Sequence, residues 1–328
     1  IRGGGSKAFY GYPVEGERLD LSEHRGVIDY DPGELVLTCR AGTRLQEIRD
    51  LLRENGQHLP FEPPAFGETS TIGGTIACGF SGPRRPWSGS LRDYLLGVKL
   101  VNGHGEVVRF GGQVMKNVAG YDISRLMAGS LGTLGVILEA SFKVLPQPAS
   151  EMTLAISCTQ EEAIQRINLW AGQPLPLSAA SWHDGRMMVR LSGAVAETAR
   201  GADQIARSEI VDGAGHWERL REHQLAFFTD EHKLWRLSVP PATPPLELQD
   251  NCLLDWGGAQ RWYNSELPAS TLRELAAGRG GHATLFRGAA DEDRFHPQAR
   301  LMRQLQYRVK QAMDPNGIFN QMRLNRDW

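Results

Sequence analysis

The chain has 328 residues and a formal net charge of −2, with 41% hydrophobic and 23% charged residues. This is the composition of a globular protein long enough for two domains. Neither sign of charge dominates, so nothing favours a nucleic-acid or anionic-lipid partner, and no run approaches the roughly 18 apolar residues of a membrane span. The four cysteines lie far apart without a C-x-x-C pair, which excludes a locally ligated zinc or iron–sulfur site and is typical of a reducing compartment.

Glycine is the compositional deviation. The chain has 37 glycines, a larger share than the usual value of about 7%, and 24 of them lie in residues 1–148. Glycine costs backbone entropy on folding, so this enrichment requires tight turns or a backbone that closely approaches a ligand. The chain begins at Ile1 rather than Met, and we expect a trimmed or truncated start that lacks the strand leading into Gly3.

The first regular elements predicted are a strand and a helix. Residues 35–39 (LVLTC) form a strand-like run. Thr43 and Gln46 then match a capping box, in which each side chain satisfies a backbone amide at the start of a helix. The helical spacing of apolar residues ends at Asn55-Gly56, a typical C-terminal stop.

A hairpin and a long strand follow. Residues 97–101 and 106–110 flank Asn102-Gly103-His104-Gly105, which predicts two antiparallel strands joined by a tight turn. Apolar residues alternate from Val136 to Val144, as on one face of a strand. Pro146-Gln147-Pro148 ends this strand and is a candidate domain boundary.

The second half mixes helices and short strands. Residues 161–170 and 197–207 have helical patterns, whereas 187–191 and 235–239 are strand-like. The latter run fits either a partner contact or burial within its own domain. The apolar stripe of residues 301–313 predicts an amphipathic helix, and we expect this stripe to pack in the core.

Three glycine-rich clusters occur within the first 137 residues: Arg2–Lys7, Thr71–Gly74 with the nearby Ser81-Gly82-Pro83, and Gly129–Ile137. Without Cβ atoms, successive N–H groups can converge on an oxyanion. One such cluster is usually a turn. Three of them, each beside strand-like sequence, indicate a large cofactor that carries phosphate.

Several other cofactor and catalytic motifs are disfavoured. Residues 3–8 and 278–283 match G-x-G-x-x-A, but neither opens a helix in a βαβ unit, as a dinucleotide fingerprint must. The chain has no G-x-x-x-x-G-K-[ST] and no H-E-x-x-H. Ala128–Gly132 is one residue short of a nucleophile elbow, so Ser130 is assigned to the glycine cluster.

These clusters, together with Gly120-Tyr121-Asp122, resemble the flavoprotein family of vanillyl-alcohol oxidase and p-cresol methylhydroxylase. Within it, the chain is similar to the FAD-binding subunits of bacterial glycolate oxidases (glycolate dehydrogenases). The segments that carry this closer resemblance are 81–89 (SGPRRPWSG), 110–122 (FGGQVMKNVAGYD), 255–259 (DWGGA) and 280–284 (GGHAT).

The resemblance implies an α+β fold. A p-cresol methylhydroxylase-type (PCMH-type) FAD-binding domain of two subdomains would occupy residues 1–147. An α+β cap domain would occupy residues 148–290. A C-terminal helix and tail, residues 291–328, would return to the FAD domain.

The resemblance also implies which residues bind FAD. Gly3–Lys7 would form the pyrophosphate loop, and bulky residues at Gly4 or Gly74 would meet the pyrophosphate and abolish FAD retention. The full set of implied cofactor-binding residues is Gly3, Gly4, Gly5, Ser6, Lys7, Pro64, Thr71, Gly73, Gly74, Ser81, Gly82, Gly135, Val136, Ile137 and Asn320. At the last position the sequence departs from the family, because Gln321-Met322 replaces the usual Pro-Gly.

Departures from the family bear on mechanism. Members with covalently attached flavin place His after the first glycines, where this chain has Ser6, so we expect non-covalent FAD. Metal-using members carry an H-x-G-D-G-N-x-H-like segment, whereas this chain has only His282 in that stretch. We therefore expect no metal and a structural or hydrogen-bonding role for His282. No residue is assigned as the catalytic base.

The leading interpretation is a subunit of a multi-subunit enzyme that oxidises glycolate to glyoxylate, in which this chain's FAD is a redox relay or supports the complex. Its partners would be a sister FAD-containing catalytic subunit and an iron–sulfur subunit. Two alternatives stay open: a catalytically silent subunit that FAD stabilises, and a stand-alone FAD-dependent 2-hydroxy-acid oxidase. We expect a cytoplasmic location, with partner subunits making any contact to the inner membrane.

Two charged and aromatic groups have no assigned role. Arg84, Arg85 and Trp87 fit either a solvated loop ordered by prolines or a site where Arg holds a carboxylate or reduced flavin. Lys116 and Tyr121 leave the same choice.

Overall fold

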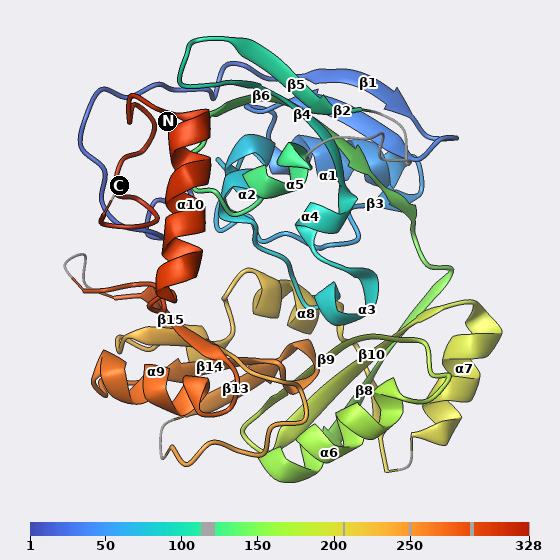
Figure 1. The fold of residues 1–328 in the computed structure, drawn as a ribbon. Coiled ribbons are helices and arrows are strands. Elements are labelled where there is room, and N and C mark those ends of the chain that lie inside the picture. Colours follow the sequence, from blue (N-terminus) through green and yellow to red (C-terminus); the bar gives the residue numbers. More distant parts are fainter. Residues whose placement is uncertain (113–121, 206, 249–250, 289–291, 328) are drawn as a thin grey trace. The chain divides into compact units, whose positions relative to one another are not determined.

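The computed structural model describes the whole chain except residues 113–121, 206, 249–250, 289–291 and 328 (Figure 1). It divides into two compact units. The first unit contains Ile1–Ser81, Gly89–Gln147 and Pro297–Trp328, and the second contains Gly82–Ser88 and Pro148–His296. The chain therefore enters the second unit briefly at residue 82, long before the main crossing at residue 148. Lys116 and Tyr121 lie outside the described residues.

The first unit is built on a five-stranded antiparallel sheet in the order β1-β2-β6-β4-β5, beside a two-stranded sheet, β3-β7. The strands are β1 (Val27–Asp31), β2 (Val36–Arg40), β3 (Gln57–His58), β4 (Leu95–Val101), β5 (Val107–Gly111), β6 (Val136–Lys143) and β7 (Leu145–Pro146). The helices are α1 (Leu45–Glu54), α2 (Ile72–Cys78), α4 (Leu91–Tyr94), α5 (Ile123–Met127) and α10 (Arg300–Met313).

The sequence predictions for these strands are confirmed. β4 pairs antiparallel with β5 across the Asn102–Gly105 turn, and the Asn102 side chain accepts hydrogen bonds from the His104 and Glu106 amides at 3.0 Å. Leu37, Leu45 and Phe142 are completely buried in one apolar core between sheet and helices. This core holds the sheet that carries the glycine-rich turns.

The predicted capping box of α1 is wrong. The residue before the helix is Arg44, and no side chain caps it. The Thr43 hydroxyl instead accepts from the Gly26 amide at 2.9 Å and donates to the Arg40 carbonyl at 2.7 Å. The Thr43 hydroxyl, which the sequence pattern predicted to cap the helix, therefore forms tertiary hydrogen bonds instead.

The second unit is built on an eight-stranded antiparallel sheet in the order β11-β8-β10-β9-β13-β14-β12-β15. Its strands are β8 (Ser150–Ser157), β9 (Leu177–His183), β10 (Arg186–Gly193), β11 (Glu209–Val211), β12 (Leu234–Ser238), β13 (Cys252–Asp255), β14 (Gln260–Asn264) and β15 (His282–Arg287). Its helices are α3 (Arg85–Ser88), α6 (Gln160–Ala171), α7 (Val195–Gln204), α8 (Ala214–Arg221) and α9 (Ala269–Ala277), with short 3₁₀ turns η1 (Ala226–Thr229) and η2 (Trp256–Gly258).

Burial within its own unit accounts for the apolar run of β12. Trp235 and Leu237 are 1% and 0% exposed, and both belong to a core cluster with residues of β13, β14 and β15. The alternating pattern of this strand therefore reflects internal packing.

Helix α10 departs from its sequence prediction. Its bounds agree with the apolar stripe, but only Lys310 and Met313 are buried. Leu301 is 78% exposed and Leu305 is 55% exposed. The expectation that the whole stripe packs in the core is wrong for its N-terminal half. None of the helices in the described ranges is long and apolar enough to cross a membrane.

Candidate cofactor site

A cavity of about 650 Å³ in the first unit is lined by residues from each of the three glycine-rich clusters. It lies within the range of about 300–1,000 Å³ that ligand pockets occupy. Most of the residues implied to bind the cofactor line it: Gly3, Gly4, Gly5, Ser6, Lys7, Thr71, Gly73, Gly74, Gly135, Ile137 and Asn320. Segments far apart in the sequence thus meet at one place.

Four implied residues lie outside the cavity lining. Pro64 and Val136 are buried, and Val136 lies in the sequence between Gly135 and Ile137, which line the cavity. The Ser81 hydroxyl accepts from the Leu91 amide at 3.1 Å at the start of α4. Gly82 belongs to the second unit, where its carbonyl accepts from Trp256 Nε1 at 3.0 Å.

The loop Gly3–Ser6 offers a row of amide donors to the cavity. The preceding Arg2 pairs with the segment around Asp20 through a bridge of two backbone hydrogen bonds of 2.8 Å. The four N–H groups of Gly3–Ser6 donate to no other residue in the described part of the chain. Successive unused amides of this kind form a concave site for an anion.

Glycine at position 4 is required by the protein itself. A Cβ atom on Gly4 would lie 1.4 Å from the Thr69 carbonyl oxygen, and the Thr69 hydroxyl donates to the Gly4 carbonyl at 2.8 Å. The expectation that a side chain here would first meet a pyrophosphate is therefore wrong in its reason, because the loop itself would have to move.

Gly74 differs from its neighbours. A Cβ on Gly3 would lie 2.3 Å from the Thr71 hydroxyl, and one on Gly73 would lie 2.7 Å from the Ala41 Cβ. The nearest atom to a Cβ on Gly74 is the Thr71 hydroxyl at 3.3 Å, which also accepts from the Gly74 amide at the start of α2. Among these three glycines, Gly74 is the position where a larger side chain would extend into the cavity.

Lys7 places a buried positive charge at the cavity. It is 7% exposed, and its Nζ donates to the Ser70 hydroxyl at 2.8 Å and the Ala65 carbonyl at 3.1 Å. The Ser6 hydroxyl donates to the same carbonyl at 2.8 Å. These contacts fix the end of the glycine loop against the segment that leads to α2.

The C-terminal tail supplies another wall. Asn320 Nδ2 donates to the Leu131 carbonyl at 2.7 Å, and its Oδ1 accepts from the Ile1 nitrogen at 2.7 Å. The Arg323 guanidinium donates to the carbonyls of Ala8 and Tyr10 at 3.1 and 2.7 Å. Residues from both ends of the described chain are therefore tied together beside the third glycine cluster.

Sequence reasoning missed the buried pair that holds this tail. Lys310 Nζ donates to Asp314 Oδ2 at 2.5 Å, the Thr133 carbonyl at 2.7 Å and the Phe319 carbonyl at 3.0 Å. Burial raises the pKa of Asp314, but hydrogen bonds from Lys310 and from the Phe319 and Ile318 amides outweigh it and lower the pKa overall. The only sequence signal was a lysine within an apolar stripe, four residues before an aspartate.

The cavity fits a diphosphate-bearing cofactor. Its lining holds four basic residues (Arg2, Lys7, Arg18 and Arg323) and two acidic ones (Glu15 and Glu17), an excess of positive charge. The buried Ser130 hydroxyl, beside Leu131 and Gly132 in the lining, has no hydrogen-bond partner among the described residues. Together with the unused loop amides, these groups leave donors and charge for an anionic ligand.

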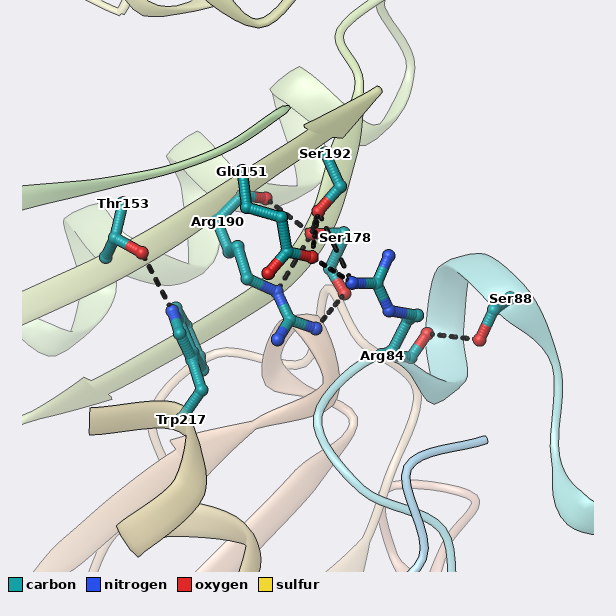
Figure 2. Close-up of polar contacts among 8 residues, drawn as sticks. All are labelled: Arg84, Ser88, Glu151, Thr153, Ser178, Arg190, Ser192 and Trp217. Carbon is teal, nitrogen blue, oxygen red and sulfur yellow. Dashed lines mark hydrogen bonds and ion pairs between the residues drawn. The ribbon is translucent and has the colours of Figure 1, made fainter. Parts of the chain in front are cut away.

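The second unit presents a polar network instead (Figure 2). Arg84 forms an ion pair with Glu151 on β8, whose carboxylate also accepts from the Ser192 hydroxyl at 2.7 Å. The Ser192 and Ser178 hydroxyls lie 2.7 Å apart, and Arg190 Nε donates to Ser178 at 3.0 Å. The carboxylate that Arg84 holds in this structure thus belongs to the chain itself.

The segment with Arg84 is anchored in the second unit at a further point. The guanidinium of Arg85 lies 4.3 Å from the ring centroid of Trp256, and Trp256 Nε1 donates to the Gly82 carbonyl. The ring of Trp87 lies within 3.8 Å of a Cβ built on Gly257. Two of the distinctive sequence segments, 81–89 and 255–259, therefore contact each other.

His282 lies near a second imidazole. Its ring centroid is 6.4 Å from that of His296, and burial followed by the charges of Arg236 and His296 lowers the pKa of His282. No group of three or more His, Cys, Asp or Glu residues that could hold a metal occurs in the part of the chain that the structure describes.

Comparison with known proteins identifies the family. The sequence model of the FAD binding domain family matches residues 1–111. The chain is 46% identical, over 99% of its length and 91% of the relative's, to the glycolate oxidase subunit GlcE of Escherichia coli. The chain belongs to this glycolate oxidase subunit family. Its first domain is an FAD-binding domain, and the chain binds FAD.

Other relatives match mainly one part of the chain. The glycolate oxidase subunit GlcD of Bacillus subtilis is 36% identical over 43% of this chain and 30% of its own length, and the D-lactate dehydrogenase of Archaeoglobus fulgidus is 34% identical over 54% and 40%. A solved alkyldihydroxyacetonephosphate synthase aligns with a TM-score of 0.65 at 17% identity, covering 94% of this chain and 69% of that protein. The predicted α+β, PCMH-type fold is confirmed.

Proposed function

We propose that this chain is the non-covalent FAD-binding subunit of a multi-subunit glycolate oxidase, which converts glycolate to glyoxylate. One observation carries the proposal: three glycine-rich segments converge on one cavity in a chain that is 46% identical to GlcE over 99% of its length. The D-lactate and D-2-hydroxyglutarate dehydrogenases among the relatives support a 2-hydroxy acid as the substrate class.

The residues that would hold FAD are those of the cavity. The amides of Gly3–Ser6 and the charge of Lys7 suit the pyrophosphate, since both lie at the same loop. Gly74, Gly135, Ile137 and Asn320 supply the remaining contacts with the cofactor in this proposal. When bound, FAD supplies a two-electron acceptor.

The partners proposed are a sister FAD-containing subunit that carries the hydroxy-acid site and an iron–sulfur subunit that receives electrons. The 36% identity of this chain to a GlcD subunit over 143 residues supports a shared FAD-binding scaffold in the two flavoproteins. In this arrangement the FAD of the present chain relays electrons or supports the complex. We further propose a cytoplasmic location, with any contact to the inner membrane made by partner subunits.

The proposal is tested by anaerobic titration with glycolate, followed by the visible absorbance of bound flavin. We expect no bleaching of the isolated chain and full bleaching once the sister subunit is added. Bleaching of the isolated chain would favour a stand-alone 2-hydroxy-acid oxidase. Wild-type oxidase activity in a complex containing a variant without FAD would favour a silent, FAD-stabilised subunit.

The non-covalent link rests on Ser6. Its hydroxyl is committed to the Ala65 carbonyl at 2.8 Å, and serine lacks the imidazole nitrogen of family members with attached flavin. Acid precipitation of the purified chain should release all flavin into the supernatant. Yellow colour that stays in the washed pellet would contradict this assignment.

A further inference from the structure

The segment that follows α10, residues 314–323, forms one wall of the cofactor cavity and is called the tail strap below. Five of its residues line the cavity: Gly317, Ile318, Asn320, Gln321 and Arg323. All residues of the strap are described by the structure, and none belongs to a helix or strand. The course of the strap is therefore set by its contacts with the rest of the first unit.

The backbone of the strap adopts an unfavourable conformation at two positions. Asn320 and Met322 have φ values of 38° and 63°, in the left-handed region that residues other than glycine rarely adopt. Such a conformation persists only where surrounding contacts impose it. The strap is thus held in place rather than held by its own backbone preference.

The first contact that holds the strap is buried at its start. The Asp314 carboxylate, which is 0% exposed, accepts from the amides of Ile318 and Phe319 at 2.9 and 2.8 Å. Lys310 of α10 donates to the same carboxylate. These bonds would remain if the far end of the strap were released.

The second contact is made by Arg323 at the far end. Its guanidinium donates to the carbonyls of Ala8, Tyr10 and Tyr12 at 3.1, 2.7 and 3.2 Å. The Arg323 carbonyl accepts from the Tyr12 amide at 2.9 Å. A planar guanidinium carries five N–H donors, so one side chain can hold several carbonyls at once. Arg323 therefore binds the strap to the segment that follows the glycine loop.

A glycine outside the three glycine-rich clusters makes room for this contact. A Cβ on Gly11 would lie 2.9 Å from the Arg323 carbonyl oxygen and 3.1 Å from its Cγ, and Gly11 has a φ of +86°. Gly11 does not line the cavity, so a bound cofactor does not account for it. The close approach of Arg323 does.

The segment that Arg323 holds is continuous with the loop whose amides face the cavity. The amides of Ala8 and Tyr10 donate to the carbonyls of Gly5 and Lys7, each at 3.1 Å. The turns formed by these bonds connect the glycine loop to the carbonyls that Arg323 binds. Release of Arg323 would therefore loosen the loop and remove a wall of the cavity together.

We propose that Arg323 is a positioning residue for FAD, an inference that rests on the proposed placement of FAD in the cavity. It holds the tail strap against the segment after the glycine loop, so that FAD binding and docking of the strap stabilise each other. Such a coupling is reciprocal. The docked strap raises the affinity for FAD, and bound FAD keeps the strap docked.

The first test removes the contact in the full chain. Arg323→Met deletes the donors, and the dissociation constant is measured by titrating the apoprotein with FAD. We expect the affinity to fall at least about tenfold, mainly through faster dissociation, since hydrogen bonds from a charged donor are lost. Arg303→Met is the matched control, because Arg303 is an exposed residue of α10 that contacts Asp327 at 3.5 Å and does not line the cavity. It should leave the affinity unchanged.

Arg323→Lys separates position from charge. Lysine keeps the positive charge beside the cavity, but its compact ammonium lacks the fork that binds several carbonyls. We expect nearly the same loss of affinity as with Arg323→Met. Affinity equal to that of the wild type would mean that the charge acts on FAD itself, and this would overturn the positioning role.

The second test uses the wild-type chain, with and without saturating FAD. Trypsin cleaves after arginine, and cleavage after the half-buried Arg323 requires local opening of the strap. FAD should slow this cleavage at least about fivefold, because it stabilises the docked state. Cleavage after Arg207, which is exposed in a turn of the second unit, is the internal control and should proceed at one rate in both samples.

Each contrary outcome overturns a stated part. Wild-type affinity of Arg323→Met, or cleavage after Arg323 that FAD does not slow, overturns the positioning role. If the Arg323→Met apoprotein does not fold, the cleavage test on the wild type decides alone. If Gly74→Leu retains FAD as well as the wild type does, the cofactor lies elsewhere and its proposed placement fails instead.

Discussion

Both units bury cations, but they use them differently. In the first unit, Lys7 is held by a hydroxyl and a carbonyl at the edge of a cavity, beside loop amides that donate to no described residue. In the second unit, the fully buried Arg261 donates to the carbonyls of Gly258, Pro244 and Thr243.

The difference shows which donors are open to a ligand. In the second unit, the donors of Arg261 bind carbonyls of the same unit, and Arg84 forms an ion pair with Glu151 of that unit. The first unit places a positive charge and unused amides together. On this chain, recognition of an anionic cofactor is therefore a property of the first unit.

The largest effects are expected at two glycines of the cavity. Gly4→Ala should cost about 3 kcal/mol or more of unfolding free energy, because its Cβ overlaps the Thr69 carbonyl. Gly74→Leu should instead weaken FAD binding at least about tenfold while the apoprotein stays as stable as wild type, since Leu is also the better helix former. Flavin absorbance and urea unfolding of both apoproteins check this, and a Gly74→Leu chain that retains FAD would contradict the cavity assignment.

The next effect is expected at the buried pair that holds the tail. Lys310→Met leaves Asp314 buried without its cation, and we expect a loss of about 3–5 kcal/mol in unfolding free energy. Arg308→Met, on an exposed position of the same helix, is the control and should change stability by less than about 0.5 kcal/mol. Equal urea midpoints of the two variants would show that the pair does not hold the tail.

A smaller effect with a different readout is expected in the second unit. Arg261→Met leaves three carbonyls without their donor, which should cost about 1–3 kcal/mol. Flavin content per chain should nevertheless equal that of wild type, because the carbonyls that accept from Arg261 all lie within the second unit. Loss of flavin from the folded variant would contradict the inference that recognition of the cofactor is a property of the first unit.

The smallest effect expected is a change in the pH dependence of stability. The folded-state pKa of Asp314 is lowered from 3.8, so the carboxylate stabilises the protein above that pH, and this contribution is lost as the pH falls through the folded-state pKa. The difference in unfolding free energy between wild type and Asp314→Asn should therefore shrink below pH 3.8. A difference that stays constant between neutral pH and pH 3 would contradict the lowered pKa.

The sequence predicts local elements better than tertiary contacts. The Asn102–Gly105 turn predicted β4 and β5 because these two strands pair locally in the chain. Alternating apolar residues predicted β6 from its own periodicity, although its partners β2 and β4 lie far away in the sequence. The capping box at Thr43 failed because a residue 17 positions away takes its hydroxyl. The apolar stripe of residues 301–313 predicted helix α10, but this periodicity does not indicate which part of the stripe is buried.

The candidate site was predictable only in part. Glycine clusters are visible in the sequence, and most of them line one cavity. Ser81 and Gly82 are adjacent in sequence, yet the chain crosses between the units at that bond, which no local pattern reveals. Lys310 could not be found because its partner carbonyl, Thr133, lies 177 residues away. The roles of the lining residues toward FAD stay predictions.

The amide of Asn320 joins the earliest and the latest parts of the described chain next to the cavity. A nascent polypeptide makes its glycine loop first and gains this wall only after some three hundred further residues have left the ribosome. The pocket therefore stays open on one side throughout synthesis, and a fragment that stops before α10 would present its loop amides to solvent.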